Sequence, residues 1–202
     1  MKKLLWIILI GFVIYWLLIR DNAVTQPDGV LAPEQPRQTA PVSTAPFQHK
    51  GHSITPLADF QITARVLSVE HYGLDRESEL SPVDLALGWG PMSDNRVIQE
   101  IDISQRGRWY YWQVEGPTIA LRQIELNSAN MHMIPANDTV ETLLERVREG
   151  QVVTIEGKLI EARTPDGWRW RSSLTRADTG ARACEVVWVD HIYATSQATP
   201  SR

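Results

Sequence analysis

The feature that most constrains this chain is a two-residue alternation of apolar and polar side chains in residues 58–72. Phe60, Ile62, Ala64 and Val66 alternate with polar residues across this stretch. Because successive side chains of a β-strand point to opposite faces, the period predicts a strand with one buried face. Shorter segments of strand character follow at residues 107–114, 129–134, 151–162, 168–174 and 182–193. The chain is therefore expected to fold mainly as β-sheet.

One segment follows a helical period instead. In residues 137–150, Val140, Leu143, Leu144 and Val147 recur at i, i+3, i+4 and i+7, which places them on one helix face. The resulting order of three strands, a helix and two or three closing strands resembles the OB-fold, a five-stranded barrel. We therefore predict an α+β domain, mainly β with one helix, that forms a small OB-like β-barrel. A split or SH3-like barrel is the alternative topology.

The amino-terminal residues have a different composition. Residues 4–19 form a run of 16 residues without a charge, bracketed by Lys2 and Lys3 and by Arg20. A helix of this length spans about 24 Å, slightly less than the roughly 30 Å hydrocarbon core of a bilayer. The run predicts a single-pass transmembrane anchor at residues 1–20, in a bacterial inner membrane, with a cytoplasmic amino end and a periplasmic domain. A cleaved signal peptide is the alternative, but the small residues of a cleavage site are missing.

The remaining boundaries follow from composition. Residues 21–46 contain five prolines and show no apolar period, which predicts an extended, flexible linker. Residues 47–194 are assigned to the barrel domain, and residues 195–202 to a disordered tail. The linker would hold the domain away from the membrane.

Charge and cysteine content exclude several classes of function. The formal net charge of -4 argues against a general nucleic-acid binder, since such binding neutralises several phosphates with cations. The single cysteine, Cys184, excludes an intramolecular disulfide and a four-thiolate zinc site. His49 and His52 lack a third metal ligand nearby, and the glycines follow no nucleotide-loop pattern. We therefore predict no metal site and no cofactor.

A short tryptophan and arginine alternation is one candidate binding surface. Residues 168–171 place Trp168 and Trp170 on one side of a strand and Arg169 and Arg171 on the other. The pattern favours indoles packed against the core with the arginines in water, because each buried indole contributes about 2 to 3 kcal/mol by area. Exposed indoles would instead form a ligand surface.

Two further stretches are candidates for binding. Residues 109–112 carry aromatic groups on both strand faces, so one face can stay open to a partner. The long excursion at residues 71–108 contains an apolar segment between the first two strands, where an OB-like barrel borders its binding face. The pattern favours a lid that covers one end of the barrel, and a binding loop centred on Trp89 is the alternative. The predicted binding residues are Trp89, Met92, Tyr110, Trp112, Trp168, Arg169 and Arg171.

Three segments resemble a protein family. The sequences SPVDLALGWGPMSD (81–94), NMHMIPAN (130–137) and GWRWRSSLTRADTGARACEVVWVDHI (167–192) are similar to a family of small, membrane-anchored bacterial envelope proteins. The similarity covers most of residues 51–192. It implies a bacterial origin and the extent of the domain, and it implies no activity, substrate or catalytic residue.

These features predict a binding or scaffolding module for a protein or polymer of the cell envelope, and they favour such a module over an enzyme. The alternative is a cysteine-dependent envelope hydrolase that uses Cys184 with His132 or His191, together with an acid such as Asp84 or Asp190. Cys184 lies in an apolar alternation, where a buried, inert thiol is the default.

Self-association is a third hypothesis. Val187 and Val189 face opposite to Val186 and Trp188 in the last predicted strand. A strand that is apolar on both faces suits a sheet covered on both sides, which a second copy of the chain can provide.

Overall fold

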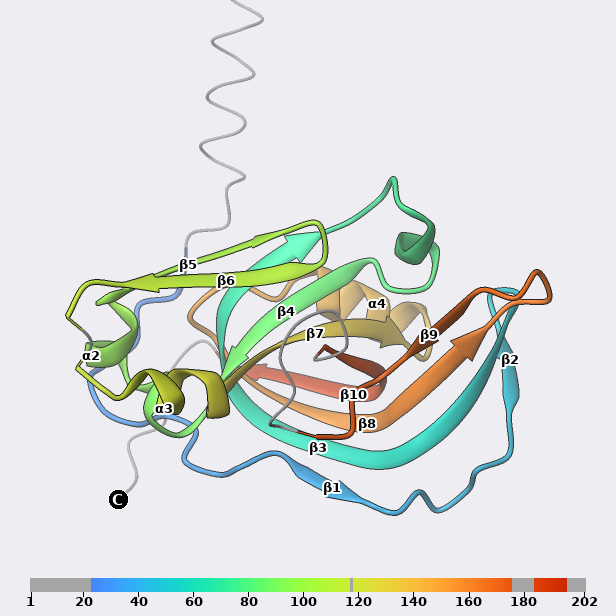
Figure 1. Cartoon of the computed structure of the whole chain (residues 1–202), viewed down its shortest axis with the longest axis horizontal. Helices are drawn as coiled ribbons and strands as arrows, with labels where there is room; N and C mark the ends of the chain where they lie inside the picture. The colour runs from blue at the N-terminus through green and yellow to red at the C-terminus, as the bar shows by residue number, and fades with distance from the viewer. Residues whose placement is uncertain (1–22, 117, 176–183, 196–202) are drawn as a thin grey trace, which may run out of the picture.

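Strands dominate the part of the chain that the structure describes (Figure 1). The computed structural model describes residues 23–116, 118–175 and 184–195. The strands are β1 (Arg37–Thr39), β2 (Phe47–His49), β3 (His52–His71), β4 (Val83–Gly88), β5 (Ile101–Arg106), β6 (Trp109–Val114), β7 (Ser128–Pro135), β8 (Val152–Arg163), β9 (Arg169–Arg171) and β10 (Glu185–Thr195). The helices are η1 (Arg76–Glu79), η2 (Gly90–Ser93), α2 (Asn95–Ile98), α3 (Leu121–Leu126) and α4 (Asp138–Glu145). The prediction of a mainly β fold with few helices is confirmed.

Strand β3 is the longest element and the centre of the fold. Its alternating residues Phe60, Ile62, Ala64 and Val66 are buried, as the two-residue period predicts. β3 pairs antiparallel with β1, β2, β4 and β8, so one long strand joins the short amino-terminal strands to the main sheet.

The main sheet is mixed. Its strands follow the order β1-β3-β4-β7-β10-β8-β9, and β3 also pairs with β8. β7 and β10 run parallel, whereas the other pairs are antiparallel. On the side away from β3, β8 pairs first with β10 through residues 152–159 and then with β9 through residues 161–163. β9 therefore continues the line of β10 at the point where β10 turns toward β7.

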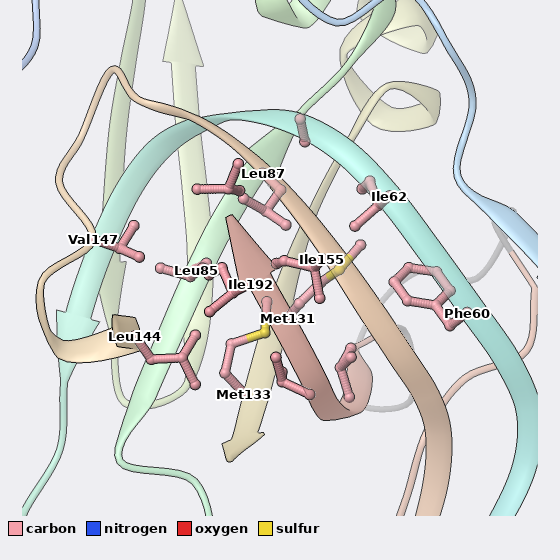
Figure 2. Packing of buried hydrophobic residues seen from close by; sticks show 14 of the residues in the cluster. Phe60, Ile62, Leu85, Leu87, Met131, Met133, Leu144, Val147, Ile155 and Ile192 are labelled. Carbon is pink, nitrogen blue, oxygen red and sulfur yellow. The ribbon is translucent and has the colours of Figure 1, made fainter. Parts of the chain in front are cut away.

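The largest apolar cluster lies on the inner face of this sheet (Figure 2). Leu85 of β4, Met131 and Met133 of β7 and Ile155 of β8 point into it, and all four side chains have no exposed surface. Helix α4 covers one side of the cluster with apolar residues of its own, including Leu144. Complete burial of such a side chain contributes about 1.5 to 3 kcal/mol, so this cluster holds the strands together.

Two smaller clusters lie on the outer face. Strand β9 covers the first, where Trp168 and Trp170 pack against buried residues of β8 and β10 such as Ile160 and Val186. The β5–β6 hairpin covers the second. The turn of that hairpin is Gly107 and Arg108, which both have positive φ and connect the paired residues Arg106 and Trp109. Positive φ at both central residues is typical of a type I′ turn.

The segment predicted to be a flexible linker runs along the domain. The Val24 amide donates a hydrogen bond to the Glu149 carbonyl at 2.7 Å, and the Ala32 carbonyl accepts one from the Gly90 amide at 2.7 Å. Residues Arg37–Thr39 form β1 on the edge of β3. The attachment uses backbone groups and isolated polar side chains, which leave no apolar period in the sequence, so composition alone predicted an unattached tether.

No helix among the described residues is long and apolar enough to span a bilayer. The longest of them, α4, has eight residues, whereas a transmembrane helix needs about 20. This finding corrects the placement as a single-pass inner-membrane protein with a periplasmic domain, which no described helix supports. The apolar run at residues 4–19 lies outside the described residues, as do residues 196–202 of the predicted tail.

Candidate functional site

A cleft of about 720 Å³ opens beside strand β9. β9 supplies Arg169, Trp170 and Arg171 to one wall. His132 of β7 and the turn of the β5–β6 hairpin supply the opposite wall. The cleft therefore joins residues that are far apart in the sequence.

Trp170 of β9 and Trp168, which precedes the strand, are both half-buried. The Trp170 ring lies 4.7 Å from the His132 ring, and the Trp168 ring lies 5.4 Å from the His52 ring, both measured between centroids. Both indoles also pack against the outer apolar cluster. The two tryptophans of the alternating Trp168–Arg171 segment therefore pack against the core, and Trp170 also lines the cleft.

The arginines of β9 share one carboxylate. Glu161 of β8 lies 2.5 Å from Arg169, 2.9 Å from Arg171 and 2.5 Å from Arg163. Burial would raise the pKa of Glu161, but hydrogen bonds from the three guanidinium groups lower it to about 2. Three positive charges around one negative charge leave this surface cationic, although the whole chain is acidic. Arg169 and Arg171, whose side chains are 49% and 43% exposed, carry that charge to the edge of the cleft.

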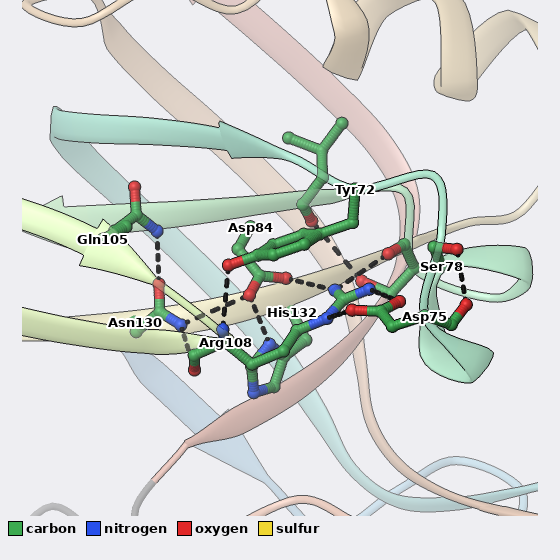
Figure 3. Close-up of polar contacts among 10 residues, drawn as sticks. Tyr72, Asp75, Ser78, Asp84, Gln105, Arg108, Asn130 and His132 are labelled. Atoms are coloured by element: carbon green, nitrogen blue, oxygen red, sulfur yellow. Dashed lines mark hydrogen bonds and ion pairs between the residues drawn. The ribbon is translucent and has the colours of Figure 1, made fainter.

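A buried carboxylate supports the opposite wall (Figure 3). Asp84 of β4 has no exposed surface, and its Oδ1 atom accepts a hydrogen bond from Arg108 Nη1 at 2.9 Å. Its Oδ2 atom lies 2.9 Å from His132 Nδ1 and 3.5 Å from Asn130 Nδ2. The backbone pairs Asp84 with His132 on adjacent strands, which explains why the two side chains meet. The carboxylate therefore lies beside the imidazole that lines the cleft.

Arg108 completes this network from the hairpin turn. Its guanidinium group donates to both carboxylate oxygens of Asp75, at 2.8 and 3.0 Å, and lies 3.8 Å above the Tyr72 ring. Burial would lower the pKa of Arg108, but the hydrogen bonds to Asp75 and the charge of Asp84 raise it. The same hydrogen bonds lower the pKa of Asp75, and burial raises the pKa of Tyr72 to about 12. The hairpin turn is therefore fastened to β4 and to the residues that follow β3.

The structure brings Cys184 and His132 to one cleft and leaves His191 elsewhere. Cys184 is half-buried and lines the cleft beside β9 together with His132. His191 and Asp190 instead line a separate cleft of about 670 Å³. Burial, followed by the charges of Glu185 and Asp84, raises the pKa of the Cys184 thiol to about 12. The thiol is therefore protonated near neutral pH, where a nucleophilic cysteine needs its thiolate.

Two of the predicted binding residues are core residues. Trp89 is 1% exposed and its Nε1 donates to Gln35 Oε1 at 2.9 Å, and Met92 has no exposed surface. Neither side chain can contact a partner in this arrangement. The amino-terminal segment covers the indole, so the structure places both of these predicted residues in the core.

The aromatic residues of β6 that face outward are not the ones predicted to bind a partner. Tyr110 and Trp112 are half-buried against the second outer cluster, and burial raises the pKa of Tyr110 to about 12. The side chains that face outward are Trp109 and Tyr111, which are 39% and 47% exposed. Trp109 lines the cleft, and sequence reasoning missed it as it missed Arg108. Gly107, which lies between two alternating segments, is a hairpin signal. It could have placed Arg108 in the turn and Trp109 at the start of the next strand.

Comparisons with known proteins found no match for this chain: no family model, no curated protein and no solved structure matches it. Within residues 23–116, 118–175 and 184–195, no group of three or more metal-ligating side chains is gathered for a metal ion.

Proposed function

We propose that the domain is a binding module that takes an acidic segment of a partner protein in the cleft beside β9. The observation that carries the proposal is the excess of positive charge beside the cleft. Arg169 and Arg171 line it, and they share the single carboxylate of Glu161 with Arg163, which lies outside the lining. Guanidinium groups bind carboxylates through paired hydrogen bonds, so exposed arginines at a cleft favour a carboxylate ligand.

The strand pairings support an OB-like barrel as the scaffold of this module. β3, β4, β7, β10 and β8 pair in that order and β8 pairs again with β3, with α4 between β7 and β8 in the chain. An OB-fold has the same succession, and its second and third strands and the loops after its first and fourth strands border the binding face. Here Glu77 follows β3, His132 lies on β7 and residues 169–174 follow β8. This correspondence supports the cleft as the binding face of an OB-like barrel.

The composition of the cleft favours a protein partner over a nucleic acid. Trp109 and Leu174, which are 39% and 38% exposed, add apolar contact area beside the arginines. Tryptophan and arginine are the residues most enriched where a protein interface gains its binding energy. Glu77 at the rim and the net charge of -4 oppose a phosphate backbone. An acidic segment that also carries apolar side chains suits both the arginines and the apolar residues of the cleft.

Cysteine-dependent hydrolysis is the second candidate, because Cys184 and His132 line one cleft and His132 contacts the buried Asp84. Binding is favoured over it because the pKa of the Cys184 thiol is raised to about 12. A protonated thiol is a poor nucleophile.

The proposal is tested by titrating the full-length protein into a fluorescein-labelled peptide of alternating glutamate and valine, followed by fluorescence anisotropy. We expect binding that weakens as salt is added, because exposed charges are screened. The double variant Arg169→Gln/Arg171→Gln should bind about tenfold more weakly or worse.

Arg163→Gln is the matched control. Arg163 contacts the same Glu161 at 2.5 Å, but it is not among the residues that line the cleft. We expect this variant to bind within about twofold of the unmodified protein. Failure of the acidic peptide to bind, equal binding of a lysine and valine peptide, or equal weakening by Arg163→Gln would each contradict the proposal.

A further inference from the structure

We propose that the partner segment binds as an extended strand, antiparallel to β9, along the edge of β9 that faces away from β8. This inference rests on the proposed function and specifies the conformation and sequence pattern of the ligand. We call this edge the outer edge of β9.

The hydrogen bonds that flank β9 show which backbone groups face β8. The Trp168 carbonyl accepts from the Thr164 amide at 3.1 Å, and the Ser172 amide donates to the Ile160 carbonyl at 3.0 Å. Both even-numbered residues of this segment therefore bond toward β8. Because backbone groups alternate in direction along a strand, those of the odd-numbered residues point to the outer edge.

Arg169 and Arg171 are the odd-numbered residues of β9. The next odd-numbered residue, Ser173, donates its amide to the Cys184 carbonyl at 3.1 Å, which lies on the side away from β8. In the described part of the chain, β9 pairs with β8 alone. The amides and carbonyls of Arg169 and Arg171 therefore point toward the cleft that β9 borders.

A strand edge of this kind is a template for another extended chain. Peptides that add to a sheet edge gain affinity from backbone hydrogen bonds and specificity from side chains at alternate positions. In an antiparallel pair, a residue opposite Arg169 or Arg171 exchanges both backbone bonds with it and places its side chain on the same face. That face carries the exposed guanidinium groups.

The side chains of β9 then determine the sequence that fits. Each guanidinium group carries five N–H donors, and three such groups share the two oxygens of Glu161. The remaining donors suit a carboxylate opposite Arg169 and another opposite Arg171. The residue between them faces the side of Trp170 and His132, where an apolar side chain fits. The preferred ligand is therefore an extended acidic, apolar, acidic segment.

The test compares two N-methylated forms of the glutamate and valine peptide with the unmodified peptide, using the full-length protein and the same anisotropy measurement. N-methylation of the glutamates removes the amides that would bond to Arg169 and Arg171. We expect this peptide to bind about tenfold more weakly or worse. N-methylation of the valines, the matched control, removes amides that point away from β9, and binding should stay within about twofold.

Backbone amide exchange provides a second readout. On binding of the unmodified peptide, exchange of the Arg169 and Arg171 amides should slow at least about tenfold, since exchange reports local protection. The Trp170 amide, which faces β8, should change little.

The outcomes separate this inference from the proposed function. Arginine-dependent binding that is insensitive to either methylation, or sensitive only at the valines, overturns the strand pairing while the binding module stands. Tighter binding of a single-stranded oligonucleotide at the same cleft, or no binding of the unmodified peptide, overturns both.

Discussion

Arg108 Nη1 lies 2.9 Å from Oδ1 of Asp84, a carboxylate with no exposed surface. The two residues are 24 positions apart and lie on different sheets, so their contact joins the β5–β6 hairpin to strand β4. Asp84 in turn contacts His132 at the cleft. One buried carboxylate therefore contacts two residues that line the cleft, Arg108 and His132.

Asp84→Asn should lower the free energy of unfolding by about 3 kcal/mol, because removing one partner leaves the charge of Arg108 without its buried counterion. Urea denaturation measures the change. Arg122→Ala serves as the control, since Arg122 and its partner Glu125 are 54% and 41% exposed. That variant should stay within about 0.5 kcal/mol. Similar losses for the two variants would show that the Asp84 network adds nothing beyond a surface ion pair.

The ion cluster at Glu161 predicts an acid-sensitive stability. The folded-state pKa of Glu161 is lowered to about 2 from an ordinary value of 4.5. Its stabilising effect is therefore complete above pH 4.5 and is lost as the pH falls from 4.5 toward about 2. The melting temperature of the unmodified protein should exceed that of Glu161→Gln at neutral pH, and the difference should shrink through this window. A constant difference down to about pH 2 contradicts the assignment.

Cys184 should react slowly with alkylating reagents in the folded protein. Because burial raises the pKa of its thiol from 9.0 to about 12, the thiolate fraction near neutral pH is very small. We expect iodoacetamide to modify the native protein more than about tenfold more slowly than the urea-unfolded protein near pH 8. Mass spectrometry over time gives both rates. Faster modification of the native protein would favour the hydrolase over the binding module.

Gly157 should not tolerate a side chain. A Cβ atom at this position would lie 1.9 Å from the Trp188 carbonyl oxygen, so the backbones of β8 and β10 would have to separate. Gly157→Ala should lower the free energy of unfolding by about 2 to 3 kcal/mol. Gly73→Ala is the control, because no atom lies within 4 Å of its added Cβ, and it should change stability by less than about 0.5 kcal/mol. Equal stability of the two variants would contradict the close approach.

Much of the secondary structure could be predicted because its signals are local. The alternation around Phe60 predicted β3, and the helical period around Leu144 predicted α4. The helix ends earlier than predicted, at Glu145, and its N-cap is Asn137, whose side chain accepts from the Val140 amide. Helix and strand periods follow from backbone geometry within a few residues, so they are visible in any short window.

The candidate site could be predicted only in part. Arg169 and Arg171 were identified because their alternation with tryptophan is a local pattern, and they line the cleft. Trp89 was assigned to a binding surface because it lies in an apolar segment between the first two predicted strands, where an OB-like barrel borders its binding face. Its burial depends on Gln35, which lies 54 positions earlier, and no local pattern reports such a contact.

The sequence by itself determined the β-rich fold, the position of the main helix and the arginine and tryptophan strand, since each is a property of neighbouring residues. Only the tertiary structure decided that residues 23–39 attach to the domain, that Asp84 and Arg108 meet, and that β9 borders a cleft with His132. The physical reason is the distance along the chain over which each interaction acts. Side-chain periodicity is set by bonds along the chain, whereas burial and charge pairing are set by residues that folding alone brings together, such as Gln26 and Gly150, which are 124 positions apart.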